Sequence, residues 1–458
     1  MDRYKKIEIK GDKIVYYFID NGKFFVTSEE IKDEKWLKMK SSESAIERRE
    51  RTGLIHDSFS LNFMSARTCN MGCKYCFAGE GEYDDNPEKD KIMKASVYLK
   101  AFDWVLNVNK KFISNISLFG GEPMLGFAEF KSAIEQLEKI CELKKCPMPQ
   151  ISISTNAVLF DNDIFRFIKK YKVKVGLSVD GPEYINDLGR IAKRSSSNKI
   201  SAYNCVANAA RKLREEGMFY TIQCTLNAEH IRAYTPGIIR KWIIDMGDLA
   251  KCDMVYVPVT TDHTDLKIID YKKLVNIAKE LVDFYIEELL KDESQYSSSL
   301  VNGTFLGLIY KMYFPSCKGG DGFYLVDTDG DLFPCHIFCN NTGYKIGSIY
   351  SNEGVNQELE RGFLQHNKSH CNECQDCIAK NVCKVWCNGL QQLYNGTEDE
   401  PLTERCIFQK AIVEHGIRRI VELKLYEKKK YEILIRHMIE KNNEYIMRKM
   451  DGTKARVG

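Results

Sequence analysis

The chain has 458 residues, of which 44% are hydrophobic and 29% are charged, a composition that supports a large folded core and excludes a disordered polypeptide. Its 67 basic and 64 acidic side chains leave a formal charge of +3, so neither nucleic acid nor a membrane surface is an expected partner. No long uncharged apolar run predicts a membrane-spanning helix, and the charged first residues do not resemble a signal peptide. We therefore expect a soluble, cytoplasmic protein of two to four domains.

Residues 1–57 are expected to form a small α+β module. The segments KIEIK, KIVYYFID and KFFVT alternate as strands, and Asn21-Gly22 between the last two is typical of a tight hairpin turn. Thr27 and Glu30 form a capping-box pattern, which predicts that a helix opens at this point and runs through EEIKDEKWLKMK. The module is either a peptide-recognition element or an ordinary packing extension.

Residues 58–262 alternate short apolar strands with amphipathic helical stretches such as FKSAIEQLEKICELK. Repeated strand–helix units predict an α/β fold with a parallel sheet, which we expect to form a partial (β/α)6 barrel similar to a TIM barrel. In such folds, functional groups gather at the carboxyl ends of the strands. The six expected strands are SLNFMSA, NISLFG, QISISTNA, KVGLSVDG, YTIQCTLN and MVYVPVT.

The remaining chain is expected to form three parts, a helical bridge over 263–312, a loop-rich region over 313–410 and C-terminal helices over 411–458. The middle part is dense in cysteine, and the whole chain has 17 cysteines. A chain of this length does not need disulfides for stability. In a reducing cell, cysteines at short spacings therefore predict metal ligands.

The first cysteine cluster, Cys69-x3-Cys73-x2-Cys76, directly follows the first expected strand. Three thiolates at this spacing can converge on one metal centre. Structural zinc sites use four protein ligands, and no fourth cysteine or histidine lies nearby. The pattern therefore favours an iron–sulfur cluster with one iron left open for another ligand.

Polar and glycine-rich motifs follow the next three strands in phase with them. Taken together, CNMGCKYC, LFGGEP, ISTNAVLF and GLSVDGPEYINDLGR resemble the motifs of radical S-adenosylmethionine (SAM) enzymes over about residues 58–262. The resemblance implies that Cys69, Cys73 and Cys76 hold a reducing [4Fe–4S] cluster whose open iron binds SAM. It assigns to SAM Tyr75 near the adenine, Gly120, Gly121 and Glu122 at the amino group, Ser154 and Asn156 near the ribose, and Ser178 and Arg190 at the carboxylate.

The C-terminal cysteines have a spacing similar to the auxiliary-cluster extension called SPASM, while the alternative is a zinc-binding ribbon. The resemblance implies two auxiliary [4Fe–4S] clusters, and hence three clusters in all. The implied outer ligands are Cys374, Cys377, Cys383 and Cys406, and the implied inner ligands are Cys317, Cys335 and Cys387. Either Cys339 completes the inner cluster or its last iron stays open for a substrate thiolate. Cys371 has no expected role.

His336 stands where the sulfatase-maturing branch of the family has an acidic residue, which argues against that activity. The sequences CHIF and CFAGEGEY are more similar to maturases that build thioether links in six-cysteine peptides, such as freyrasin-type ranthipeptide enzymes. The resemblance implies a substrate that is a ribosomally made precursor peptide with a leader, and an electron donor such as flavodoxin or ferredoxin. Asp180 and His336 are candidate bases.

Two alternatives to thioether formation remain. The same fold could form carbon–carbon cross-links or oxidise a residue, with the auxiliary clusters serving as an electron path. A non-catalytic zinc-binding adaptor would instead bind zinc and no SAM.

Overall fold

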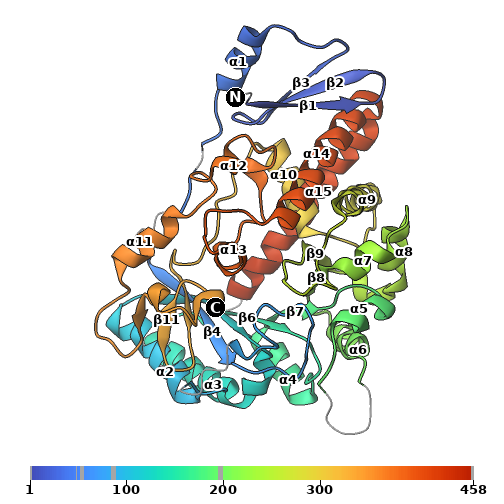
Figure 1. Ribbon diagram of the computed structural model, residues 1–458. Helices are drawn as coiled ribbons and strands as arrows, with labels where there is room; N and C mark the ends of the chain where they lie inside the picture. The colour runs from blue at the N-terminus through green and yellow to red at the C-terminus, as the bar shows by residue number, and fades with distance from the viewer. Residues whose placement is uncertain (1–2, 48, 52–55, 84–88, 194–199, 455–458) are drawn as a thin grey trace.

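The computed structural model describes residues 3–47, 49–51, 56–83, 89–193 and 200–454. Its centre is a nine-stranded sheet with the strand order β12-β11-β10-β4-β5-β6-β7-β8-β9 (Figure 1). All six expected core strands are present, and neighbouring members are parallel. They are β4 (Ser58–Ala66), β5 (Phe112–Gly120), β6 (Gln150–Thr155), β7 (Lys174–Ser178), β8 (Tyr220–Leu226) and β9 (Asp253–Pro258). The α/β prediction is confirmed.

The two faces of this sheet differ because side chains alternate along each strand. Ile151 and Ile153 of β6 are buried in the main hydrophobic core, together with the apolar faces of the surrounding helices. Ser152 and Ser154 of the same strand are only half-buried and face the other side. The helices of the core are α2 (Ala95–Asp103), α3 (Phe127–Lys144), α4 (Asn162–Tyr171), α5 (Glu183–Gly189), α6 (Ala202–Glu215), α7 (Ala228–Ala233) and α8 (Ile238–Asp245).

The cysteine-rich region extends the core sheet at its β4 edge. Strand β10 (Phe323–Val326) pairs in parallel with β4, while β11 (Asp331–Phe333) and β12 (Gly347–Ser348) continue in antiparallel order. Three short helices follow, namely α11 (Gln357–Gln365), α12 (Asn372–Gln375) and α13 (Asn388–Asn395). This continuity brings the segment between Cys317 and Cys335 beside β4, the strand that precedes Cys69.

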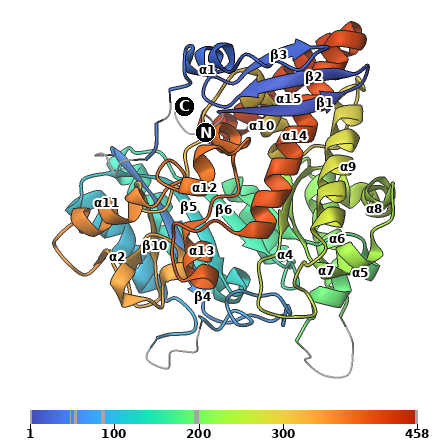
Figure 2. The same cartoon turned by 45° about the horizontal axis from the view of Figure 1, so that its top comes forward.

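Long helices connect the remaining parts. They are α9 (Tyr271–Leu289), α10 (Ser299–Ile309), α14 (Thr403–Tyr426) and α15 (Lys428–Lys454). Helix α14 packs against α9, α10, β1 and β9, so that it joins the N-terminal sheet to the core (Figure 2). Short turns of other helix types lie at Trp104–Val108, Pro123–Gly126, Gly247–Ala250, His336–Phe338, Thr342–Tyr344 and Lys380–Val382.

The N-terminal module is an antiparallel sheet of β1 (Tyr4–Ile9), β2 (Lys13–Phe18) and β3 (Lys23–Thr27), followed by α1 (Glu34–Ser42). The hairpin predicted at Asn21-Gly22 is confirmed. The predicted capping box is wrong, because Asp33 caps α1 by accepting a bond from the amide of Trp36. Thr27 instead accepts from the amide of Glu29 in a local turn.

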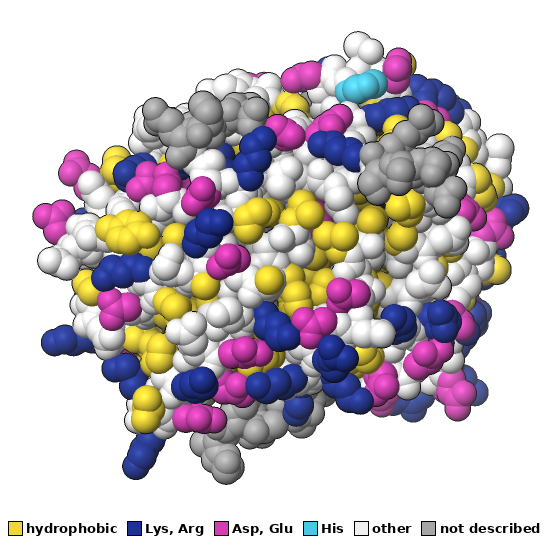
Figure 3. All heavy atoms as spheres, turned by 90° about the horizontal axis from the view of Figure 1, so that it is seen from below, with side chains coloured by type: hydrophobic (Ala, Val, Ile, Leu, Met, Phe, Trp, Pro, Cys, Tyr) yellow, Lys and Arg dark blue, Asp and Glu magenta, His cyan; other side chains and the backbone are white. Residues whose placement is uncertain are grey.

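The surface carries both signs of charge. On the face seen from below, lysine and arginine side chains are interspersed with aspartate and glutamate, and hydrophobic side chains lie between them (Figure 3). Within the described residues, no helix combines the length and the apolar character needed to span a membrane.

Candidate functional site

The loop that carries Cys69, Cys73 and Cys76 is held by the segment that follows α5. The amide of Gly72 donates to the carbonyl of Ile191 at 2.7 Å, and the amide of Lys74 donates to the carbonyl of Gly189 at 3.1 Å. A Cβ atom at Gly189 would lie 3.2 Å from the ring of Tyr75. A glycine is therefore favoured where the backbone passes this aromatic ring.

The glycine pair after β5 brings that strand end against the cysteine loop. The amide of Gly121 donates to the carbonyl of Ala66 at 2.8 Å, and the amide of Glu122 donates to the carbonyl of Thr68 at 3.0 Å. Gly120 has a φ of 142°, and a Cβ atom at Gly121 would lie 2.2 Å from the Thr68 oxygen. Larger residues would therefore separate β5 from the cysteine loop.

Glu122 is a buried link between β5 and β6. Its side chain is 1% exposed and accepts bonds from the Thr155 hydroxyl at 2.7 Å and the Asn156 amide at 2.8 Å. Burial raises the pKa of Glu122 to about 7. The Asn156 side-chain amide lies 2.8 Å from Asn70 Oδ1 and 3.8 Å from Cys69 Sγ. Two residues predicted to contact SAM thus lie together beside the first cysteine.

Asp180 organises the end of β7. Its carboxylate accepts hydrogen bonds from the Tyr75 hydroxyl and from the Thr225 amide, and it pairs with the Arg190 guanidinium at 3.1 Å. Its backbone carbonyl lies 2.5 Å from His230 Nε2. Because three donors occupy the carboxylate, the structure gives this candidate base a positioning role. The Asp180 carboxylate also neutralises the charge of Arg190, the residue predicted to bind the SAM carboxylate.

The open face of the sheet carries small polar side chains in front of these strand ends. Ser154 and Ser178 are half-buried, as predicted for residues that line a ligand site. Gly176 lies between them, and a Cβ atom there would approach Ser154 Oγ to 3.3 Å. Gln223, which is in register with Ser178, is exposed on this face. This face of the sheet thus carries small or polar side chains at the ends of β6, β7 and β8.

The thiols of Cys69, Cys73 and Cys76 are half-buried, and those of Cys69 and Cys73 keep their protons at neutral pH unless a metal centre replaces them. Burial raises the pKa of Cys69 to about 11 and that of Cys73 to about 12. In the described part of the chain, no three Cys, His, Asp or Glu side chains converge tightly enough to hold a single ion. The thiolates of a [4Fe–4S] cluster bind separate irons, and a loop with three spaced thiols fits that geometry.

The predicted inner cysteines come together at the edge of the core. Burial raises the pKa of Cys335 far above its usual value, and the nearby thiols of Cys317 and Cys387 add to this effect. Burial, with Cys387 adding to it, raises the pKa of Cys317 to about 11. The three thiols therefore form one group.

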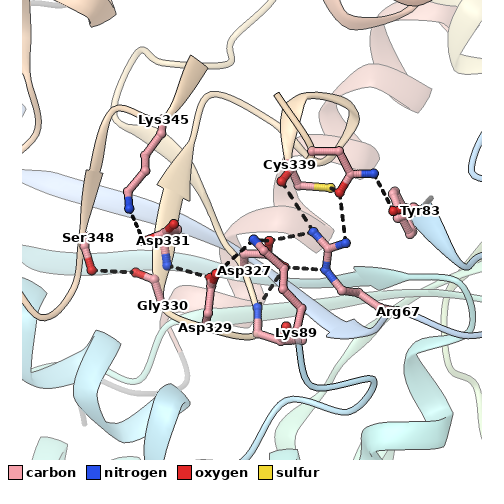
Figure 4. A network of polar contacts seen from close by, with 12 residues as sticks. Arg67, Tyr83, Lys89, Asp327, Asp329, Gly330, Asp331, Cys339, Lys345 and Ser348 are labelled. Atoms are coloured by element: carbon pink, nitrogen blue, oxygen red, sulfur yellow. Dashed lines mark hydrogen bonds and ion pairs between the residues drawn. The ribbon is translucent and has the colours of Figure 1, made fainter. Parts of the chain in front are cut away.

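Cys339 lies in a different environment. Its carbonyl accepts a bond from Arg67 Nη2 at 3.4 Å, and burial raises the pKa of its thiol to about 12 although Arg67 opposes the shift. Figure 4 shows Arg67, Lys89 and Asp327 pointing toward one another, with Cys339 beside them. The charged neighbours of Cys339 thus belong to this polar network, and its side chain packs in the same apolar cluster as Cys335.

His336, which follows Cys335, lies between the inner group and the first cysteine loop. Its ring stacks on Phe119 of β5 with centroids 3.7 Å apart, and the Phe77 ring lies at 5.6 Å. Phe77 directly follows Cys76. Burial lowers the pKa of His336 to about 3, and its Nδ1 has no hydrogen-bond partner among the described residues. The imidazole is therefore neutral and packed between the two cysteine groups.

The predicted outer cysteines also come together. One cavity is lined by these thiols and by four cationic side chains: Cys374, Cys377, Cys383 and Cys406, with Lys368, Lys380, Arg405 and Lys410. Cys371 lies against Cys374 in a hydrogen-bonded pair. The Arg405 Nε atom is buried without a hydrogen-bond partner in the residues described. A metal–thiolate centre fits this cavity because its negative charge would balance the buried cations.

Several side chains at these sites belong to no recognised motif. Arg67 stands two residues before Cys69, and Asp327 lies in the turn VDTDGD after β10. Lys368 and Arg405 lie in polar sequence that is typical of an exposed surface. Their closeness to cysteines in the sequence is the only signal that could have indicated a role.

The chain shares sequence with characterised proteins. Residues 64–228 match the family described as the Radical SAM superfamily. The chain is 25% identical over 370 residues to a cysteine-type anaerobic sulfatase-maturating enzyme of Clostridium perfringens, covering 78% of the chain and 95% of that enzyme. It is 21% identical over 341 residues to the radical SAM cyclopropyl synthase TigE of Paramaledivibacter caminithermalis, covering 72% of the chain and 68% of that protein.

A solved structure shows the same fold. Native anSMEcpe with bound AdoMet and Cp18Cys peptide has a TM-score of 0.63 and 21% sequence identity to the chain. The match covers 80% of the chain and 98% of that protein. The α/β architecture with a mostly parallel sheet is therefore shared.

Proposed function

We propose that this chain, whose residues 64–228 match the Radical SAM superfamily, is a peptide maturase that installs thioether links. The links would join cysteine thiols to carbon atoms of acceptor residues in a ribosomally synthesised precursor peptide with a leader. The similarity to a sulfatase-maturating enzyme supports a peptide or protein substrate. The narrower resemblance to ranthipeptide maturases depends on the sequences around Cys76 and Cys335.

The observation that carries this proposal is the position of the inner cysteines. The thiols of Cys317, Cys335 and Cys387 act on one another, whereas the charged neighbours of Cys339 are Arg67, Asp327 and Lys89. His336 stacks on Phe119, so the inner group lies beside the strand end that faces the first cysteine loop. Three thiols leave one position of a four-iron cluster for a substrate thiolate. When bound, SAM and the clusters supply a carbon-centred radical, this open iron and an electron acceptor.

The proposed reaction balances in atoms and electrons. The acceptor carbon loses a hydrogen atom to the adenosyl radical, which gives 5′-deoxyadenosine. The substrate thiol loses its proton, and the sulfur–carbon bond forms as one electron passes to an auxiliary site. Each link therefore makes the peptide lighter by two hydrogen atoms.

The residues of the chain position the reactants and exclude water. Asn156 and Cys69 hold one side of the SAM site, and Tyr75 with Arg190 closes another through Asp180. The aromatic rings next to the inner group shield a reactive radical from solvent. The geometry supports Asp180 as a positioning residue, and it assigns no general base.

The proposal is tested by mass spectrometry of peptides incubated anaerobically with reconstituted enzyme, SAM and dithionite. A synthetic panel of leader-bearing peptides with spaced cysteines serves as substrate. We expect a loss of two hydrogen atoms per link, fewer iodoacetamide-reactive thiols and one 5′-deoxyadenosine per link. The C69A variant is the control without the radical. An unchanged peptide mass with fully assembled clusters contradicts the proposal.

A second candidate function is oxidation of a single residue in a protein or peptide. It is favoured by the similarity to a sulfatase-maturating enzyme, which extends over most of the chain. His336 after Cys335 remains the sequence feature that argues against it. Tandem mass spectrometry separates the two, because oxidation changes one residue whereas a thioether joins two. For either function we propose a cytoplasmic location and an external reductant such as flavodoxin or ferredoxin.

A further inference from the structure

We propose that Gly81 and Tyr83 are positioning residues for SAM, because they hold Gly120 and Gly121 against the first cysteine loop. Both lie in the sequence CFAGEGEY, after the three cysteines and outside the motifs that the family resemblance assigns to SAM. This inference rests on the proposed function, in which SAM binds beside the first cysteine loop.

The segment after Cys76 forms a compact turn. The amides of Gly81 and Tyr83 both donate to the carbonyl of Ala78 at 3.0 Å. Gly79, Gly81 and Tyr83 have positive φ angles of 53°, 88° and 50°, a conformation that is strained for residues with a side chain. A residue such as Tyr83 keeps this conformation only where its surroundings fix it. The contacts of the turn with the rest of the protein therefore determine its place.

Gly81 brings the turn into direct contact with two parts of the predicted SAM site. A Cβ atom at Gly81 would lie 2.6 Å from Gly121 Cα and 2.7 Å from Cys69 Cβ. Both distances are far shorter than a van der Waals contact, so a larger residue would push these groups apart. A Cβ atom at Gly79, two residues earlier, would have nothing within 4 Å. The close approach is thus a property of Gly81 and not of the whole turn.

Tyr83 contacts the other glycine of the pair. It is 5% exposed, and its hydroxyl donates to the Gly120 carbonyl at 3.4 Å. Burial raises the pKa of Tyr83 well above its usual value, so the hydroxyl keeps the proton that it donates. A carbonyl oxygen has two lone pairs and can accept from a tyrosine and from an ammonium group together. The bond from Tyr83 therefore orients the Gly120 carbonyl for the amino group of SAM.

Tyr83 is itself held by the segment that follows Cys335. The Asn340 side-chain amide donates to the Tyr83 carbonyl, and Asn340 Oδ1 accepts from Arg67 Nη1 at 2.9 Å. The Arg67 guanidinium lies 5.8 Å from the centre of the Tyr83 ring (Figure 4). These contacts fix Tyr83 in its strained conformation. They also join the glycine pair after β5 to the polar network around Arg67.

This arrangement makes the affinity for SAM depend on residues outside the family motifs. Without the Tyr83 hydroxyl, the Gly120 carbonyl loses a donor that orients it. Without the Asn340 side chain, the turn loses the bond that fixes the Tyr83 backbone. Both changes should weaken the binding of SAM and raise its KM, while kcat at saturating SAM stays close to that of the parent, because the same complex forms once SAM is bound.

Equilibrium dialysis of reconstituted holoenzyme with radiolabelled SAM, in the absence of peptide, tests the proposal. At full iron content, we expect Y83F and N340A each to raise the Kd for SAM by about three- to tenfold, the effect of one lost hydrogen bond. The KM for SAM should rise by the same factor. The control Y285F removes another buried tyrosine hydroxyl, which contacts Tyr256 between α9 and β9, and should leave the Kd for SAM unchanged.

A matched pair of glycine variants tests the close approach. G79A and G81A both place an alanine at a positive φ angle, but only G81A adds a clash. G81A should raise the Kd for SAM at least about tenfold, or lose the iron of the first site because Cys69 is displaced. G79A should match the parent in both respects.

An unchanged Kd for SAM in Y83F and G81A at full iron content overturns the proposal. Equal effects of G79A and G81A also overturn it, because the strain of the turn would then explain the result. The peptide mass assay is independent of these measurements. Saturating SAM can restore thioether formation in Y83F, and the affinity for SAM can be measured even if no peptide is modified.

Discussion

Arg67 and Asp327 form a buried ion pair although they are 260 residues apart in the sequence. Arg67 Nε lies 2.9 Å from Asp327 Oδ1, and the guanidinium makes a second bond of 2.6 Å to the other oxygen. The side chains are 3% and 0% exposed. The pair joins the end of β4, two residues before Cys69, to the region that carries the auxiliary cysteines (Figure 4).

We predict that D327N destabilises the protein by about 3 kcal/mol, since it leaves Arg67 buried without its counterion. Urea unfolding followed by circular dichroism measures the change. The control is D103N, which removes the exposed carboxylate of the Lys100–Asp103 pair and should change the stability by less than about 0.5 kcal/mol. A similar small effect of both variants would show that the buried pair contributes little.

The charges around Asp327 also predict how the stability loss in D327N depends on pH. Burial alone would raise the pKa of Asp327, but Arg67 and Lys89 outweigh burial and lower it. A carboxylate with a lowered pKa in the folded state stabilises that state at neutral pH, and the contribution is lost as the pH falls through the folded pKa. We therefore expect the stability difference between the parent and D327N to be constant from pH 7 to 5 and to shrink below about pH 4.

The core strands were predictable because they combine alternating or continuous apolar runs with glycine and asparagine at their ends. The first cysteine loop was predictable because its three cysteines and the motifs after β5, β6 and β7 are local in sequence. The placement of Cys339 was not, because its distance from Cys335 suits a ligand equally well. In the structure, the Cys339 carbonyl bonds to Arg67, which an ion pair between distant segments, with Asp327, holds in place.

A similar reason explains the corrected start of α1. Thr27 and Glu30 match a capping box in the sequence, but Asp33 competes for the same role. Asp33 accepts from the Trp36 amide at 3.0 Å, and Trp36 packs on Phe25 of β3. The tertiary contact selects the later cap, which local spacing cannot reveal.

His336 is predicted to act in packing and not as a base. Its ring stacks on Phe119, and its lowered pKa of about 3 makes it a weak proton acceptor at neutral pH. The H336F variant should keep iron content and product formation within about tenfold of the parent. H336A should lower the free energy of unfolding by about 1–3 kcal/mol. A loss of product in H336F at full iron content would instead identify a proton-transfer role.

The N-terminal module carries an aromatic pair in which Phe25 is exposed and Trp36 is half-buried. Phe25 is 41% exposed, and its ring lies 4.9 Å from that of Trp36. We predict that F25A raises the Kd of a fluorescein-labelled substrate peptide about tenfold, because exposed aromatic residues often dominate such contacts. Fluorescence anisotropy measures the affinity. The control F112A removes an exposed phenylalanine at the start of β5 and should leave the Kd unchanged. If F25A and F112A change the Kd equally, the N-terminal module is a packing extension.

Cys339 and Cys387 are predicted to differ in their effect on metal content. Cys387 belongs to the inner group, whereas the Cys339 carbonyl bonds to Arg67. Reconstituted parent protein should contain about twelve iron and twelve sulfide per chain if all three sites hold [4Fe–4S] clusters. C339A should keep this content, while C387A should lose about four of each. Because C339A removes only a small buried thiol, it should also fold like the parent. A loss of four iron in C339A would make Cys339 the fourth inner ligand and remove the open iron on which the thioether proposal depends.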